Sequence, residues 1–269
     1  MEEFDTRKDR KPFVRFNRKL FIQLNYEYIY VDNEVCIGYA LNFTSPLIRG
    51  TMIRRYRRSL AEVRLESGEV ETVYSPGLGQ MRGCYEKGAP VMLSESPDPG
   101  RKHRLTWELI NIGNVWVGVN PLTSRRILQE SLEQSVLPSF HDYSLEQETI
   151  HDKKADLILQ GMENTCFVNT FGVSWGEDGS AWFPDNSNQR LRDQFYGLAE
   201  IPQRGHRAVA FFLVQRADCA NLRVSDDADT EDRDAITTAY NAGVEFLVYQ
   251  ANISFDMISL GKQIPFELR

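Results

Sequence analysis

The chain has 269 residues, of which 42% are hydrophobic and 26% charged, and its formal net charge is −7. This composition is typical of globular proteins and excludes a collagen-like, coiled-coil or fully disordered chain. The longest apolar run, Ala208 to Val214, is far shorter than the ~20 residues that a membrane-spanning helix needs. We therefore expect one large domain or two ordinary ones, with no part in the membrane.

The charges are unevenly distributed along the chain. Residues 1–118 contain 18 Lys and Arg against 15 Asp and Glu, whereas residues 119–269 contain 13 against 23. The first region is therefore better suited to contact a polyanion, and the second has a different, acidic surface.

The four cysteines, Cys36, Cys84, Cys166 and Cys219, are far apart and include no CxxC pair. This pattern predicts buried thiols in the cytoplasm or another reducing compartment. The acidic start of the chain disfavours a leader peptide, although the basic segment from Arg7 to Lys19 leaves organellar import open.

Alternating aromatic and turn residues organise the first half of the chain. Residues 1–43 form a leading segment, in which residues 25–40 could be a hairpin turning at Asp32 and Asn33. Strands are then predicted at 48–65, 70–74, 90–94, 104–110 and 115–119, separated by Gly, Pro and Ser clusters. About five short strands within residues 44–119 fit a small β-barrel of the OB type.

The pattern changes after Asn120, where helices begin to alternate with strands. Helices are predicted at 125–134, capped by Ser124, at 189–198, and at 230–240, capped by Thr230. Strands are predicted at 155–159, 166–174, 180–183, 207–214 and 245–249. Residues 120–269 should therefore form an α/β domain, which makes the fold class mixed.

Several separated segments together resemble the sugar fermentation stimulation protein family, SfsA, and they occur in the family's order. They are SPLIRGTMIRRYRRSLAEV (45–63), GQMRGC (79–84), TWEL (106–109), VNPLTSRRI (119–127), ADLIL (155–159), FPD (183–185), GHRAVAFFLVQR (205–216) and AGVEFLVY (242–249). The resemblance implies an N-terminal OB-fold linked to DNA binding. It also implies a C-terminal domain of the PD-(D/E)xK nuclease-like type.

The family's nuclease-like site has an Asp and, on the next strand, an ExK motif. Carboxylates of this kind hold a hard divalent cation such as Mg²⁺, which activates water and stabilises the phosphodiester charge. Alignment to the family keeps the Asp as Asp156 but puts Asn169 at the Glu position and Phe171 at the Lys position. We therefore expect a degenerate site with no cofactor, in which Asp156 is an ordinary strand-end carboxylate.

A basic cluster is the stronger functional signal in the sequence. It consists of Arg54, Arg55, Tyr56, Arg57 and Arg58. On a strand, Arg54, Tyr56 and Arg58 would share one face, and Arg55 and Arg57 the other. Arginines bind phosphates and tyrosine stacks on bases, so nucleic acid is the expected partner, and the family resemblance implies DNA. The simpler interpretation is an edge strand protected by charge.

Other residues extend or qualify this hypothesis. Arg126 and Arg190 match family positions and join the expected nucleic-acid-binding set, and Lys102, Arg104 and Arg125 could extend it. After FPD, however, the family's Lys-His pair is replaced by Asp193 and Gln194, and a first-helix Glu has only Glu146 as a candidate.

Two other functions stay open. The chain could be a structural or assembly subunit that uses the fold for a protein partner or a homo-oligomer, which its acidic second half favours. It could also be a metal-dependent nuclease in which Asp185 or Glu163 joins Asp156 as a relocated ligand.

Overall fold

The computed structural model describes residues 29–31, 34–36, 40–43, 46–56, 59–77, 79–145 and 155–268. The chain forms two compact units, residues 1–37 and 38–269. In the first unit, β1 (Ile29–Val31) pairs antiparallel with β2 (Glu34–Cys36), and Val31 lies opposite Glu34. The expected turn, Asp32 and Asn33, lies outside the described residues.

The second unit begins with β3 (Ala40–Asn42) and then a closed β-barrel. Its strands are β4 (Ile48–Tyr56), β5 (Leu60–Leu65), β6 (Val70–Tyr74), β7 (Pro90–Glu95) and β8 (Leu105–Ile112). The sheet order is β6-β5-β4-β7-β8, and a parallel pairing of β6 with β8 closes the barrel. This closed five-stranded arrangement is the OB-fold predicted from the strand count.

The rest of the second unit is built on a seven-stranded sheet in the order β10-β11-β12-β15-β17-β18-β3. Its new strands are β10 (Tyr143–Leu145), β11 (Leu157–Gly161), β12 (Thr165–Val173), β15 (Arg207–Val214), β17 (Glu245–Ile253) and β18 (Met257–Gln263). The central strands β12, β15 and β17 are parallel, and the flanking pairs are antiparallel. Both faces of β15 are buried, which explains its continuous apolar sequence.

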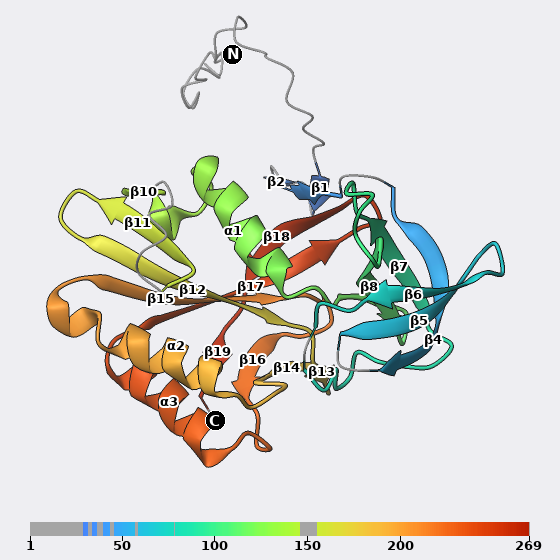
Figure 1. Ribbon diagram of the computed structural model, residues 1–269. Helices are drawn as coiled ribbons and strands as arrows, with labels where there is room; N and C mark the ends of the chain where they lie inside the picture. The colour runs from blue at the N-terminus through green and yellow to red at the C-terminus, as the bar shows by residue number, and fades with distance from the viewer. Residues whose placement is uncertain are drawn as a thin grey trace, which may run out of the picture. The chain divides into compact units, whose positions relative to one another are not determined.

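Helices cover the two faces of this sheet (Figure 1). Helix α1 (Leu122–Glu133) packs on one face, whereas α2 (Gln189–Ala199) and α3 (Thr230–Asn241) pack together on the other. A smaller sheet has the order β13-β14-β16-β19. It consists of β13 (Gly176–Glu177), β14 (Ser180–Phe183), β16 (Asn221–Val224) and β19 (Phe266–Glu267).

Three hydrophobic cores hold these layers together. One fills the barrel around Trp107, and one lies between the main sheet and α2 and α3. The third lies beneath α1 and also includes Met92 and Leu109 from the barrel strands. Because this core contains residues from both halves, the barrel and the α/β domain pack against each other directly. The strand β9 (Val115–Gly118), which extends the barrel sheet, leads into α1.

The mixed fold class is confirmed, but some predicted boundaries are wrong. The single strand predicted at 48–65 is a hairpin of β4 and β5. Ser124 does not cap α1: it lies inside the helix, and its hydroxyl donates to the Pro121 carbonyl. Helix α3 begins at Thr230, with Asp229 at the cap position, so Thr230 is a helical residue and not the cap.

Two other expectations can be compared with the described residues. Cys84, Cys166 and Cys219 are free and buried, as predicted. No helix in the described part of the chain is long and apolar enough to cross a membrane.

Candidate functional site

The outer face of the barrel strands β4, β5 and β6 carries two tyrosines in one cross-strand row. Tyr56 pairs with Leu60, which in turn pairs with Tyr74. The neighbouring row contains Arg54, Glu62 and Thr72. The alternate residues Ala61, Val63 and Val73 are fully buried in the barrel, so these two rows face outwards.

Each tyrosine has an arginine beside its ring. The guanidinium carbon of Arg54 lies 5.3 Å from the centre of the Tyr56 ring, and that of Arg101 lies 5.1 Å from the centre of the Tyr74 ring. The Tyr56 hydroxyl is 3.3 Å from the Thr72 hydroxyl. We call Arg54, Tyr56, Thr72, Tyr74 and Arg101 the tyrosine platform.

Arg54 is also held by an acid on the adjacent strand. Its Nε and Nη2 donate to Glu62 at 2.6 and 2.7 Å, and this pairing lowers the pKa of Glu62 below its usual value. The pair is exposed to solvent, so it contributes little to stability and Arg54 can exchange Glu62 for another anion.

A groove of about 560 Å³ continues the tyrosine platform toward the loop between β7 and β8. Thr72 belongs to both features, and the loop supplies Lys102, His103 and Arg104 to the groove wall. Arg104 pairs with Glu95 at 2.7 Å. In OB-folds, the face formed by strands 2 and 3 and the loops around it is the surface that binds oligonucleotides.

Arg55 points away from the tyrosine platform and holds the loop that follows β6. Its Nη1 donates to the Gly79 carbonyl at 2.9 Å, and its Nη2 donates to the Gly77 carbonyl at 2.5 Å. The structure thus separates Arg54 and Tyr56 from Arg55, as strand alternation predicts. It places Arg55 at the junction between the barrel and the α/β domain.

The other predicted basic residues do not join the tyrosine platform. Arg57 and Arg58 follow β4 and lie outside the described residues, as does Glu146. Arg126 is exposed on α1. Arg190 is exposed on α2 and lines a pocket with Asp156.

The predicted degenerate positions, Asp156, Asn169 and Phe171, lie at β11 and β12. Asp156 precedes β11, and its Oδ2 accepts from the Thr170 amide at 2.8 Å and the Thr170 hydroxyl at 3.0 Å. Asn169 Oδ1 accepts from the Asp156 amide at 3.0 Å, and its Nδ2 donates to the Gln194 carbonyl at 3.4 Å. The Asn169 side chain therefore ties β11 to α2 through backbone groups.

Phe171 lies in the aromatic core between the sheet and α2. Its ring stacks on Phe195 and Phe212, with centroid distances of 5.0 Å to each, and its side chain is buried. Phe171 is therefore part of the hydrophobic core.

Asp185 links the α/β domain to the barrel. Its Oδ2 accepts from the Met81 amide at 2.8 Å and its Oδ1 from the Arg82 amide at 3.3 Å. Burial raises the pKa of Asp185, and the two amides oppose that rise. This contact joins residues over a hundred positions apart in the sequence, so local patterns could not reveal it.

Sequence reasoning also missed Tyr74 and Arg101. Tyr74 follows the inward-facing Val73 at the end of a predicted strand, so alternation could have placed it on the outer face. The loop position of Arg101 over Tyr74 has no comparable signal.

Comparison with known proteins supports the resemblance. The family model described as SfsA N-terminal OB domain matches residues 53–119, and the model described as Sugar fermentation stimulation protein RE domain matches residues 122–257. Together the two models match most of the chain.

Similar proteins and a solved structure agree with these matches. A sugar fermentation stimulation protein homolog from Geotalea daltonii is 37% identical over 223 residues, covering 82% of this chain and 96% of that protein. A homolog from a Synechococcus strain is 35% identical, covering 79% and 90%. The structure of Pyrococcus furiosus SfsA in complex with Ca²⁺ superposes with a TM-score of 0.77 at 17% identity, covering 85% and 100% of the two chains. At that identity the superposition supports the fold alone.

Proposed function

Because the chain belongs to the sugar fermentation stimulation protein (SfsA) family, we propose that it binds nucleic acid, with DNA favoured, through the tyrosine platform. The observation that carries this proposal is the row of Tyr56, Leu60 and Tyr74 across three barrel strands, with Arg54 and Arg101 beside the rings.

The chemistry of the tyrosine platform suits an unpaired strand. Aromatic rings stack on bases of any sequence, and arginines contact phosphates or stack on bases themselves. Two strand spacings, or about 10 Å, separate the backbones of Tyr56 and Tyr74. The Tyr56 side chain extends toward β6, because its hydroxyl lies 3.3 Å from the Thr72 hydroxyl. Lys102 and Arg104 then line the groove into which a bound backbone would continue.

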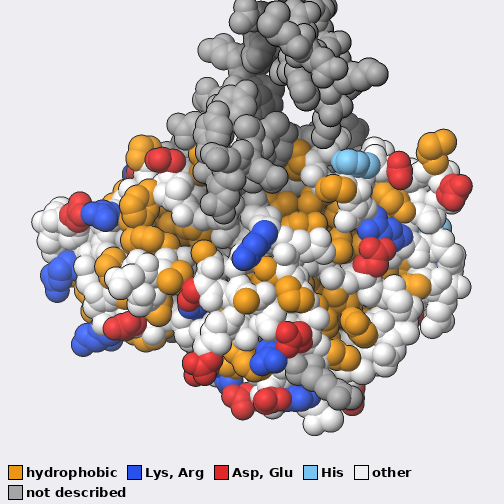
Figure 2. All heavy atoms as spheres, turned by 180° about the vertical axis from the view of Figure 1, so that it is seen from behind, with side chains coloured by type: hydrophobic (Ala, Val, Ile, Leu, Met, Phe, Trp, Pro, Cys, Tyr) orange, Lys and Arg blue, Asp and Glu red, His pale blue; other side chains and the backbone are white. Residues whose placement is uncertain are grey.

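The proposal depends on this local arrangement and not on the net charge. Among the described residues visible in Figure 2, acidic and basic side chains are scattered between hydrophobic and polar ones without a broad basic field. A protein with a net charge of −7 needs a concentrated binding surface to attract a polyanion.

Substitution of both tyrosines tests the tyrosine platform. We expect Tyr56→Ala/Tyr74→Ala to weaken the binding of a labelled single-stranded oligonucleotide by about thirtyfold or more, because each of the two lost stacking contacts costs at least about 1 kcal/mol. Fluorescence anisotropy measures the affinity at ~50 mM salt.

A tyrosine elsewhere on the barrel domain provides the control. Tyr85 is 40% exposed and lies outside the tyrosine platform. Tyr85→Ala should bind like wild type, and an equal loss in Tyr85→Ala and in the double variant would contradict the proposal.

We further propose that the α/β domain has a nuclease-like fold whose metal site is degenerate. The Pyrococcus furiosus protein was solved in complex with Ca²⁺, so a divalent cation is the group to test against the residues of this chain. The residues here do not fit one. Asp156 and Asp193 line the same pocket, but Asp156 accepts from Thr170 and Asp193 accepts from Gln189. The amide of Asn169 is bonded to backbone groups, and Phe171 is packed among rings. The described residues include no cluster of three His, Cys, Asp or Glu side chains that could hold a metal ion.

Neither of the two relocated ligands named above suits the nuclease alternative. Asp185 accepts the amides of Met81 and Arg82 and lines a different pocket from Asp156. Glu163 follows the far end of β11 from Asp156, so the five-residue strand separates the two carboxylates by about 16 Å.

A cleavage assay tests the degenerate site. Wild-type protein incubated with labelled DNA and RNA in the presence of Mg²⁺ or Mn²⁺ should leave both substrates intact, because Asn169 and Phe171 supply neither a second carboxylate nor a charged amine beside Asp156. Metal-dependent cleavage by wild type that disappears in Asp156→Ala would overturn this proposal.

A further inference from the structure

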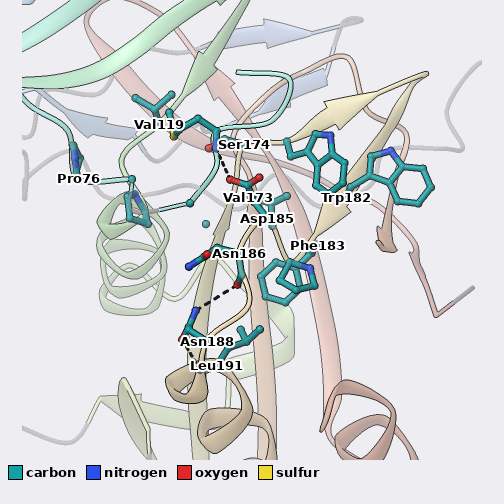
Figure 3. Close-up of a pocket in the computed structure, with 17 residues that line it drawn as sticks. Pro76, Val119, Val173, Ser174, Trp182, Phe183, Asp185, Asn186, Asn188 and Leu191 are labelled. Atoms are coloured by element: carbon teal, nitrogen blue, oxygen red, sulfur yellow. Dashed lines mark hydrogen bonds between the residues drawn. The ribbon is translucent and has the colours of Figure 1, made fainter. Parts of the chain in front are cut away.

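A pocket lies where the barrel meets the α/β domain (Figure 3). Its volume is about 250 Å³. Pro76, Gly77 and Gly79 line it from the barrel side, and Val173 and Ser174 at the end of β12 line the opposite side. Trp175 and several residues between Trp182 and Leu191 also line it. The volume is just below the ~300–1,000 Å³ of typical small-molecule sites, which suits a single flat ring system.

Aromatic side chains form part of the wall. Phe183, Trp175 and Trp182 all line the pocket, and the two tryptophan rings lie 6.2 Å apart. Arg82 covers Trp175 with its guanidinium carbon 4.8 Å from the ring centre. Such walls favour a planar, polarisable ligand.

Asp185 supplies the charged group of the pocket. Each of its carboxylate oxygens accepts one backbone amide, and each retains further acceptor capacity. The loop can approach this closely only because Gly79 has no side chain: a Cβ there would lie 2.3 Å from Asp185 Oδ2. The carboxylate is therefore fixed in place before any ligand arrives.

Two asparagine side chains, those of Asn186 and Asn188, line the pocket after Asp185. Asn188 caps α2, with its Oδ1 accepting from the Leu191 amide at 2.9 Å. Asn186 is half-buried, and its side-chain amide forms no hydrogen bond within the described part of the chain. Asn186 can therefore donate to or accept from a ligand beside Asp185.

We infer that this pocket binds the guanine base of a guanosine nucleotide, with Asp185 accepting from the base and Asn186 contacting it alongside. The edge of guanine presents two adjacent N–H donors, which match the two oxygens of a carboxylate. Uracil presents one donor between two carbonyl oxygens, which the Asp185 carboxylate would repel. This inference rests on the proposed function: the guanine would be a base of the nucleic-acid strand that the protein binds, and a free guanosine nucleotide presents the same base.

The test uses mononucleotides, which are too short to span the tyrosine platform. Guanosine 5′-monophosphate should shift the NMR signals of the Trp175 and Trp182 indole N–H groups, and uridine 5′-monophosphate should bind at least about tenfold more weakly. Asp185→Asn should weaken guanosine monophosphate binding by about tenfold or more, because one acceptor oxygen becomes a donor. Asn186→Phe should abolish binding, because the larger side chain would occupy the pocket that Asn186 lines.

Asp227→Asn is the matched control, since Asp227 is an exposed carboxylate that pairs with Arg82 but does not line the pocket. It should bind the nucleotide like wild type. Tyr56→Ala/Tyr74→Ala should also retain mononucleotide binding, so failure of this inference is distinguishable from failure of the tyrosine platform.

Equal binding of the two nucleotides, or no indole shift at ~10 mM nucleotide, would overturn the inference. An equal loss in Asp185→Asn and Asp227→Asn would also overturn it. If Asp185→Asn does not fold, the folded Asn186→Phe variant decides: unchanged binding refutes the pocket.

Discussion

At the scale of single residues, Asn169 and Phe171 have structural roles in β12. Both side chains are buried on the same face of β12. Asn169 bonds backbone groups of Asp156 and Gln194, and Phe171 stacks with two other phenylalanines. A charged pair at these positions would lose those contacts and would be largely excluded from water.

Substitution of Phe171 measures how much its packing contributes to the stability of the protein. Phe171→Lys should destabilise the protein by about 3–5 kcal/mol or more, because it removes a buried ring and introduces an unpaired ammonium. Phe171→Leu keeps an apolar side chain and should cost about 1–3 kcal/mol less than Phe171→Lys. Urea unfolding followed by circular dichroism gives both values, and equal stability of Phe171→Lys and wild type would show that the position is not part of the core.

At the scale of elements, the long predicted strand is the most instructive error. The stretch 48–65 has β-forming residues almost throughout, yet it folds as β4 and β5 with a bulge between Met52 and Arg54. Periodicity identifies strand residues, but the sequence between the two strands has no Gly or Pro to mark where the first strand ends. The cap predicted for α1 was wrong for a related reason. Serine is a common N-cap residue, but Ser124 is buried inside the helix.

The small sheet of β13, β14, β16 and β19 was largely unpredictable for a different reason. Only β14 was predicted; its partner β16 lies about forty residues away and β19 about eighty. Two of the four strands have only two residues each. By contrast, β6, β14 and β15 match their predicted bounds. The continuous apolar run of β15 reflects its burial on both faces.

Helices α2 and α3 are joined by a buried ion pair. Arg192 Nη1 lies 2.9 Å from Oδ1 of Asp232, whose side chain is 0% exposed. Asp232→Ala should destabilise the protein by about 3 kcal/mol, because it leaves the Arg192 guanidinium without its buried partner. Urea unfolding measures the loss.

Glu231 offers a matched control for this pair. It contacts Arg192 at 3.4 Å, but its side chain is 76% exposed. Glu231→Ala should cost less than about 1 kcal/mol. Similar losses in the two variants would show that burial does not strengthen the contact with Asp232.

At the scale of the whole molecule, the two proposed binding sites lie in different places. The tyrosine platform lies on the barrel, and the junction pocket lies where residues 76–81 meet residues 172–191 of the α/β domain. The sequence predicted the two architectures and the basic cluster. It could not predict the pocket, because that site depends on packing between segments far apart in the chain.

The charge asymmetry of the sequence follows the same division. The first 118 residues carry a small excess of basic residues, and the remainder is acidic. An assembly subunit would also tolerate an acidic second half, so the two hypotheses differ chiefly in whether the barrel binds nucleic acid.

The most direct measurement is therefore the affinity of the wild-type protein for a single-stranded oligonucleotide between ~50 and ~200 mM salt. Binding through phosphates releases counterions, so the logarithm of the affinity should fall linearly with the logarithm of the salt concentration, by about 0.7 for each phosphate contacted. Arg54→Gln/Arg101→Gln should make that slope shallower. No retention of DNA or RNA at ~50 mM salt would contradict the account and favour the assembly alternative.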